Sequence, residues 1–208
     1  MMHHSDDYIE DCFLRPTYDE ELFDLWCGRL PLRKEDTPYH SGPHSIRQFQ
    51  SALKLIQTDD CAPRILETGF CLGHSASILL ELGAAFVCSI DNSLRPQTLQ
   101  AVTVMKSVYD NRFEYISGSS ADPEQRLDLK LQGYRFDLMF IDGGHRFLEV
   151  DSDIRLGVSL GIKYFLLDDY FPHWGPGVQP AMRVNNLIPV AILGTMALAI
   201  KADKYRSR

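Results

Sequence analysis

Three aspartates follow two of the most apolar stretches of the sequence. Asp142 ends "FDLMFID", and Asp168 and Asp169 end "KYFLLDD". If both stretches are strands of one sheet, these carboxylates meet at adjacent strand ends, where like charges a few ångströms apart raise one another's pKa. The three acids therefore either diverge into solvent as caps and loop residues, or a cation holds them together. Oxygen ligands of this kind suit Mg²⁺, with Mn²⁺ or Ca²⁺ as alternatives.

A histidine stands shortly after the first of these acids, in "FIDGGH". Because free imidazole has a pKa of about 6.5, His145 can accept a proton near neutral pH, and such a base typically contributes about 10²–10⁴-fold to a rate. Asp142 could share this role. The alternative is that His145 merely begins the helix that follows.

A second candidate site is the turn in "ILETGFCLGHSASILL", where Glu67, Gly69 and Gly73 form E-x-G-x-x-x-G. Glycines let a backbone pass close to a ligand, and the free amides of a helix beginning at Gly73 attract negative charge. Ser75 can offer a hydroxyl in the first turn of that helix. The turn has neither the dinucleotide G-x-G-x-x-G pattern nor the Lys-Ser/Thr ending of a phosphate loop, so neither NAD nor ATP is favoured. A tight turn whose glycines serve packing is the alternative.

Asp91 strengthens the interpretation of this turn as a ligand site. It ends the next apolar run, "AFVCSID", about twenty residues beyond the turn, where nucleotide-binding sheets place an acid that accepts hydrogen bonds from ribose hydroxyls. Taken alone, an acid at a strand end is more often a helix cap. Together with the glycines, it predicts a nucleoside-containing ligand.

Strand and helix signals alternate along the part of the chain that carries these residues. Alternation of this kind predicts an α/β protein with a Rossmann-like doubly wound sheet, mainly parallel with one antiparallel C-terminal strand, which binds ligands at the carboxyl ends of its strands. Gly194 and Thr195 join the last two strands in a hairpin. We expect strands at 64–69, 85–91, 113–118, 136–143, 163–169, 188–193 and 196–202, and helices at 17–30, 46–57, 74–83, 95–108, 121–131, 145–160 and 178–187.

Length and composition limit the protein to a few classes. At 208 residues we expect an N-terminal segment at 1–45 and one domain at 46–208. A net charge of −7 without a cluster of Lys and Arg argues against nucleic acid or an anionic membrane as a partner. The N-terminus lacks a secretory pattern, and the longest apolar run is too broken to span a membrane. Five widely spaced cysteines without a CxxC pair argue against a zinc site and favour the cytoplasm.

Over roughly residues 46–200 the chain resembles the class I S-adenosylmethionine-dependent methyltransferases. The resemblance rests on five stretches that follow in that family's order: the glycine turn, "SIDNS", "ISGSSAD", "FDLMFIDGGH" and "FLLDDY". Within this class the chain resembles the small-molecule O-methyltransferases of catechol and macrocin type. The resemblance implies S-adenosylmethionine as cofactor and a lid formed by the N-terminal segment. The residues that it places around the cofactor are Glu67, Gly69, Phe70, Gly73, Ser75, Asp91, Asn92, Ser119, Ser120 and Asp142.

The same resemblance implies that Asp142, Asp168 and Asp169 hold Mg²⁺ or Mn²⁺, and that His145 stands where related enzymes place a basic Lys or His. The metal would fix two neighbouring oxygens of a small hydroxylated acceptor, a sugar or a catechol-like compound, for O-methylation. The alternatives are a metal-independent small-molecule methyltransferase of the same fold and a catalytically silent cofactor-binding protein. Many relatives pair through N-terminal helices, which leaves room for a homodimer.

Overall fold

A computed structural model describes residues 44–56, 61–119 and 133–202 of the chain. The helices expected at 17–30 and 121–131, and nearly all of the segment at 1–45, lie outside these residues. The division of the chain at residue 45 stays a prediction.

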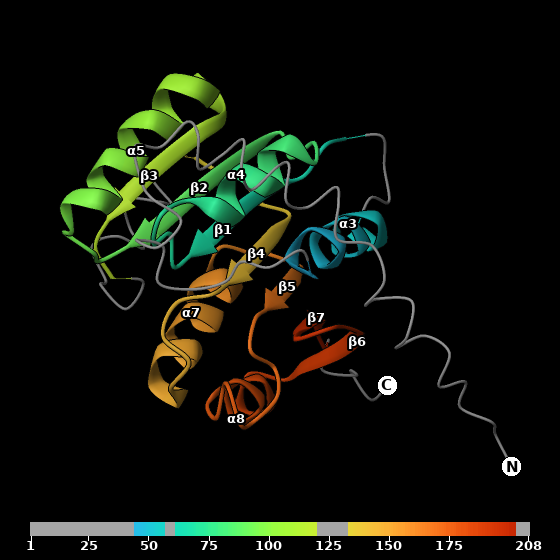
Figure 1. Cartoon of the computed structure of the whole chain (residues 1–208). Helices are drawn as coiled ribbons and strands as arrows, with labels where there is room; N and C mark the ends of the chain where they lie inside the picture. The colour runs from blue at the N-terminus through green and yellow to red at the C-terminus, as the bar shows by residue number, and fades with distance from the viewer. Residues whose placement is uncertain (1–43, 57–60, 120–132, 203–208) are drawn as a thin grey trace, which may run out of the picture.

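The core of the protein is a seven-stranded sheet with the order β3-β2-β1-β4-β5-β7-β6 (Figure 1). β1 to β5 pair in parallel, whereas β7 is antiparallel to both β5 and β6. The predicted fold class is therefore confirmed, including the single antiparallel strand. The strands are β1 (Arg64–Thr68), β2 (Phe86–Asp91), β3 (Phe113–Ser117), β4 (Leu138–Ile141), β5 (Tyr164–Leu167), β6 (Leu187–Leu193) and β7 (Met196–Lys201).

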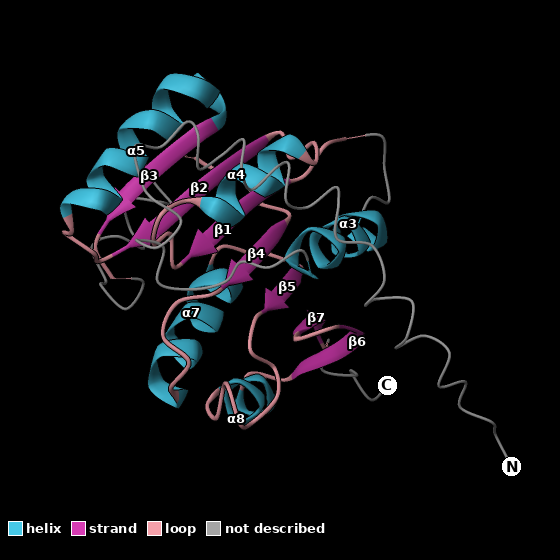
Figure 2. Ribbon diagram, in the orientation of Figure 1, coloured by secondary structure: helices cyan, strands magenta, loops and turns pink. Residues whose placement is uncertain are grey.

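Helices cover both faces of this sheet (Figure 2). They are α3 (His44–Ile56), α4 (His74–Glu81), α5 (Pro96–Tyr109), α7 (Phe147–Ser159) and α8 (Val178–Val184), with a short 3₁₀ helix, η3 (Asp110–Arg112), before β3. Side chains of α3, α4 and α5 pack into one hydrophobic core, and those of α7 and α8 pack into a second core on the other face.

The two cores explain why the strands are so apolar. Neighbouring residues of a strand point to opposite faces, so Leu138 of β4 joins the first core and Met139 joins the second. A strand buried on both faces has no solvent side and needs no polar alternation. From β1 the sheet extends to one side through β2 and β3 and to the other side through β4 and β5, so the strand order reverses between β1 and β4. Parallel sheets bind ligands at such a reversal.

None of the helices in the described ranges is long and apolar enough to cross a membrane.

Candidate active site

A pocket of about 960 Å³ opens at the carboxyl ends of the parallel strands, next to the reversal between β1 and β4. Most residues predicted for the site come together in its wall, although they are spread over a hundred positions of the chain. Glu67 and Gly73 do not line the pocket, and Ser120 lies outside the described residues. The predicted residues in the wall are Gly69, Phe70, Ser75, Asp91, Asn92, Ser119, Asp142, His145, Asp168 and Asp169.

The glycines of the first turn are required by neighbouring protein atoms. Gly69 has φ of +94°, and a Cβ there would overlap the carbonyl oxygen of Asp142. Gly73 has φ of +80°, and its Cβ would come within 2.7 Å of the Phe70 ring. Packing therefore accounts for both glycines, as the alternative interpretation held, and Gly69 also faces the pocket.

Glu67 lies fully buried behind the pocket wall. Its two carboxylate oxygens accept hydrogen bonds from the hydroxyls of Ser75 on α4 and Ser89 in the middle of β2. Burial raises the pKa of Glu67 to about 7 against the lowering effect of these hydroxyls, and Asp142 and Asp91 raise it further. Glu67 therefore acts on the pocket through Ser75, whose hydroxyl it orients. A serine inside a buried strand is the one sequence signal that could have identified Ser89.

The carboxylate of Asp91 is held in place at the end of β2. One oxygen accepts the backbone N–H of Cys71 at 2.8 Å, and the other accepts the N–H of Ser93 at 2.6 Å. A carboxylate offers about four lone-pair positions, so both oxygens keep capacity for a further donor. Asp91 thus presents a fixed acceptor to the pocket from beside the glycine turn.

The acids at the ends of β4 and β5 surround His145. Its Nδ1 lies 2.8 Å from Oδ2 of Asp169, and its Nε2 lies 3.7 Å from Oδ1 of Asp142, too far for a hydrogen bond. Asp142 raises the pKa of the imidazole, and Asp169 adds to this rise against the effect of burial. Asp168 accepts a hydrogen bond of 3.2 Å from the Thr195 hydroxyl in the β6–β7 turn.

Two of these aspartates also have raised pKa values. Burial is the main cause of the rise to about 7 at Asp142, and Asp168 contributes both as a like charge and as a hydrogen-bond partner. Burial, followed by the charge of Asp168, raises the pKa of Asp169. Asp168 therefore disfavours the ionisation of both neighbouring acids, as their places at adjacent strand ends predict.

The donor set suits a hard divalent cation chemically, because it consists of carboxylate oxygens. In the described ranges, however, no three His, Cys, Asp or Glu side chains converge around one point as metal ligands do. Asp169 instead contacts His145. The metal site stays a prediction.

Two further residues, missed in the sequence, belong to the pocket. Asp153 on α7 is buried and accepts a hydrogen bond of 2.9 Å from the Thr68 hydroxyl at the end of β1. His74, the first residue of α4, has its pKa lowered to about 4 by burial and is neutral at pH 7. An acid inside an amphipathic helix gives no sign of its burial in the sequence, because its contact with Thr68 is long-range.

A glycine-containing loop behind the acids fixes their backbone. Gly177 donates its N–H to the carbonyl of His145 at 3.0 Å, and a Cβ at this position would overlap the backbone of Phe147. A Cβ at Gly175 would overlap the carbonyl oxygen of Asp169. The loop between β5 and α8 therefore packs directly against both members of the His145–Asp169 pair.

Sheet order, two-faced helix packing and a pocket at the strand reversal together define the class I methyltransferase fold. No protein-family model matches the sequence, and no curated protein is significantly similar to it. Solved structures are similar in fold. An O-methyltransferase from Bacillus cereus, in complex with S-adenosylhomocysteine, has 16% identity and a TM-score of 0.61 over 94% of this chain and 96% of its own.

Two methyltransferases of biosynthetic pathways are similar as well. The TDP-rhamnose 3'-O-methyltransferase CalS11 of calicheamicin biosynthesis has 14% identity and a TM-score of 0.58, with 97% of both chains covered. MycE of mycinamycin biosynthesis, in complex with Mg, S-adenosylhomocysteine and mycinamycin VI, has 14% identity and a TM-score of 0.52 over 100% of this chain and 65% of its own. At such identities the likeness establishes the fold, and this chain has the fold of the class I methyltransferases.

Proposed function

We propose that the protein is an S-adenosylmethionine-dependent methyltransferase that methylates a hydroxyl of a small acceptor, a sugar or a catechol-like compound, with the help of a divalent metal. The observation that carries the proposal is the arrangement of one pocket. A fixed acceptor, Asp91, stands at the glycine turn, and a histidine among three carboxylates stands across β1 at the ends of β4 and β5.

The glycine-turn end of the pocket suits the donor. Asp91 would accept hydrogen bonds from the ribose hydroxyls, and Asn92 and Ser119 lie beside it in the wall. Ser75, oriented by Glu67, would face the methionine part together with Gly69 and Phe70. Bound S-adenosylmethionine would supply the electrophilic methyl group on a positively charged sulfur, a charge that an acidic wall favours.

The other end of the pocket suits a base. With Nδ1–H donated to Asp169, the neutral imidazole presents Nε2 as a proton acceptor. His145 would take the proton from the acceptor hydroxyl through Nε2 while the oxygen bonds to the methyl carbon and the carbon–sulfur bond breaks. The proton ends on His145, where Asp169 and Asp142 favour the imidazolium.

Asp142, Asp168 and Asp169 would hold the metal. A divalent cation there would bind adjacent oxygens of the acceptor and stabilise the oxyanion formed on deprotonation. The Mg in the MycE complex supports the idea for a protein of the same fold. One observation favours a second candidate, metal-independent methyl transfer, because Asp169 already engages His145 and the described acids do not converge.

Calorimetry and a radiolabelled methyl-transfer assay test the proposal. Asp91→Ala should abolish binding of S-adenosylmethionine, whereas Asp168→Ala should keep that binding and lose Mn²⁺ binding. His145→Gln should lower kcat by about 10²–10⁴-fold and keep both ligands. Asp110→Asn, an exposed acid away from the pocket, is the control.

Each part of the proposal can fail separately. No binding of S-adenosylmethionine at high micromolar protein would refute the function as a whole. Full activity after treatment with a chelator would refute the metal and leave the second candidate. Binding without turnover of any hydroxylated acceptor would identify a silent cofactor-binding protein.

A further inference from the structure

The described wall of the pocket carries more negative charge than its one ion-paired histidine, His145, can balance. Six carboxylates line it, and neither a Lys nor an Arg does. The six are Asp91, Asp142, Glu149, Asp153, Asp168 and Asp169. A wall of this kind repels anions and attracts cations, and a closed, low-dielectric cavity strengthens both effects.

The acids concentrate at the acceptor end. Asp91 belongs to the donor end, whereas Glu149 and Asp153 project from α7 beside the acids of β4 and β5. Glu149 accepts only the backbone N–H of Arg146 among its hydrogen bonds within the described residues. A divalent cation held by the three strand-end aspartates would not neutralise the whole group.

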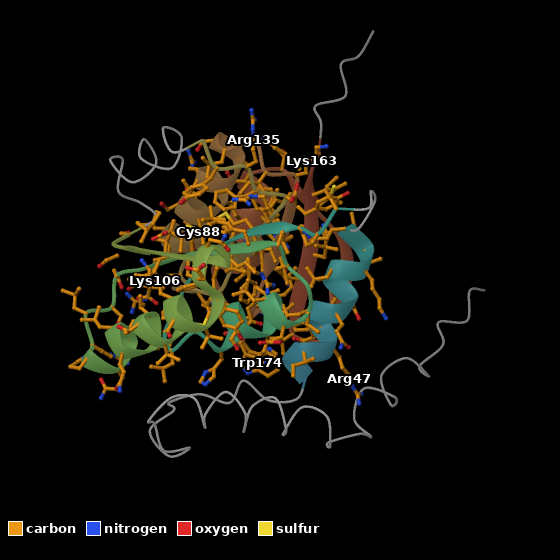
Figure 3. All side chains as sticks on the ribbon, turned by 90° about the horizontal axis from the view of Figure 1, so that it is seen from above. Arg47, Cys88, Lys106, Arg135, Lys163 and Trp174 are labelled. Atoms are coloured by element: carbon orange, nitrogen blue, oxygen red, sulfur yellow. The ribbon has the colours of Figure 1, made fainter. Side chains whose placement is uncertain are left out.

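Three basic residues stand at the opposite edge of the sheet. Arg64, Arg135 and Lys163 stand at the amino ends of β1, β4 and β5. Arg135 and Lys163 lie together on one side of the molecule, and Trp174 lies on the other side (Figure 3). Arg47 of α3 lies on the same side as Trp174, and Arg95 and Arg146 belong to loops on the pocket side, but none of the three lines the pocket (Figure 3).

Aromatic rings accompany the acids. The loop that follows Asp169 exposes Phe171 and Trp174, and the rings of His173 and Trp174 lie 4.1 Å apart. Gly175 anchors this loop on the backbone of Asp169. None of these three rings lines the described pocket, but the loop carries them next to Asp169, where an aromatic face favours an organic cation over an anion.

From these observations we infer that the acceptor is a hydroxylated compound bearing an amine, such as an amino sugar or a catecholamine, and that anionic acceptors are excluded. The inference rests on the proposed function and names its substrate class. It separates this chain from CalS11, whose TDP-rhamnose carries a diphosphate.

Two matched series of acceptors test the inference. Dopamine, 3,4-dihydroxyphenylethanol and 3,4-dihydroxyphenylacetate differ mainly in charge, as do glucosamine, glucose and glucose 6-phosphate. With the full chain, S-adenosylmethionine and Mg²⁺, kcat/KM should be at least about tenfold higher for the amine than for the anion at low salt, and the ratio should shrink as salt screens the wall.

A single charge change makes the test specific. Glu149→Gln keeps the acceptor for the Arg146 N–H, removes one negative charge from the wall and should shift the preference toward the anion by severalfold. Glu114→Gln, which removes a half-buried charge on β3 that is paired with Lys106 outside the pocket, should leave the preference unchanged. Equal or better turnover of the anions would overturn the inference. So would binding of S-adenosylmethionine without turnover in either series, whereas a failure to bind S-adenosylmethionine would refute the proposed function instead.

Discussion

At the scale of single residues, some side chains of the site affect the pocket by orienting or stabilising a neighbouring side chain. Glu67 reaches the pocket only through Ser75, and Asp169 supports His145. The identity of the acids and their places at strand ends could be predicted from the sequence, because strand ends follow from apolar runs. Glu67 lies behind the pocket wall because Ser75 of α4 and Ser89 of β2 pack against it. Contacts between such distant segments have no local sequence pattern, so the sequence could not predict whether this acid lines the pocket.

Glu67 makes the stability of the folded protein depend on pH. Its folded-state pKa of about 7 lies above the value of 4.5 for the free group, so the folded protein binds the extra proton between these values. Stability should therefore fall as pH rises from about 4.5 to 7. Glu67→Gln, which stays neutral, should be more stable than the wild type at pH 8 by up to about 3 kcal/mol, and the difference should vanish near pH 4.5.

Urea unfolding at pH 5 and pH 8 would measure this effect. Asp110→Asn removes an exposed carboxylate and should show no comparable change between the two pH values. If Glu67→Gln is instead less stable than the wild type at pH 8, the hydrogen bonds from the two serines outweigh the cost of burying the charge.

At the scale of elements, two connections that are remote from the glycine turn build the end of the pocket around His145. The β6–β7 turn contributes the Thr195 hydroxyl to Asp168, and its carbonyl accepts the N–H of Tyr170 at 2.9 Å. The hairpin itself was predictable from Gly194 and Thr195 between two apolar runs. Its position beside β5 was not, because the order β5-β7-β6 comes from strand pairing over long distances in the chain.

The loop before α8 gives a prediction at this scale. Gly177 has an ordinary negative φ of −88°, so alanine would be unstrained there, but its Cβ would overlap the backbone of Phe147 and Arg146. Gly177→Ala should destabilise the protein by about 1–3 kcal/mol and displace His145. We expect kcat to fall at least about tenfold while the Kd for S-adenosylmethionine stays the same, since the donor end is untouched.

Gly161→Ala separates this effect from simple loss of stability. Gly161 has φ of +73° with open space around it, so alanine there introduces backbone strain without a clash and lies far from the pocket. It should cost about 1 kcal/mol and leave kcat unchanged. Equal losses of kcat in both variants would show that the loop does not position His145.

At the scale of the whole molecule, the sheet has two different cores and two different edges. The alternation of strand and helix predicted both cores, since it requires helices on each face. It did not predict what each core contributes to the pocket, to which the second core adds only Ile90 among its buried hydrophobic residues. Phe49 of α3 packs edge-on against Phe140 of β4 at 5.0 Å between ring centres, and both rings line the pocket, because α3 lies over the carboxyl half of the central strands.

This difference between the cores can be tested with two matched truncations. Phe49 and Phe165 are both almost completely buried, one in the core beside the pocket and the other in the core under α7 and α8. Phe→Ala at either site should lower the free energy of unfolding by about 3–5 kcal/mol through lost contacts and a new cavity. Only Phe49→Ala removes part of the pocket wall, so only this variant should weaken S-adenosylmethionine or acceptor binding when calorimetry is performed well below the unfolding temperature. A comparable loss of affinity in Phe165→Ala would mean that ligand binding reports overall stability, and the two cores would then not be separate in function.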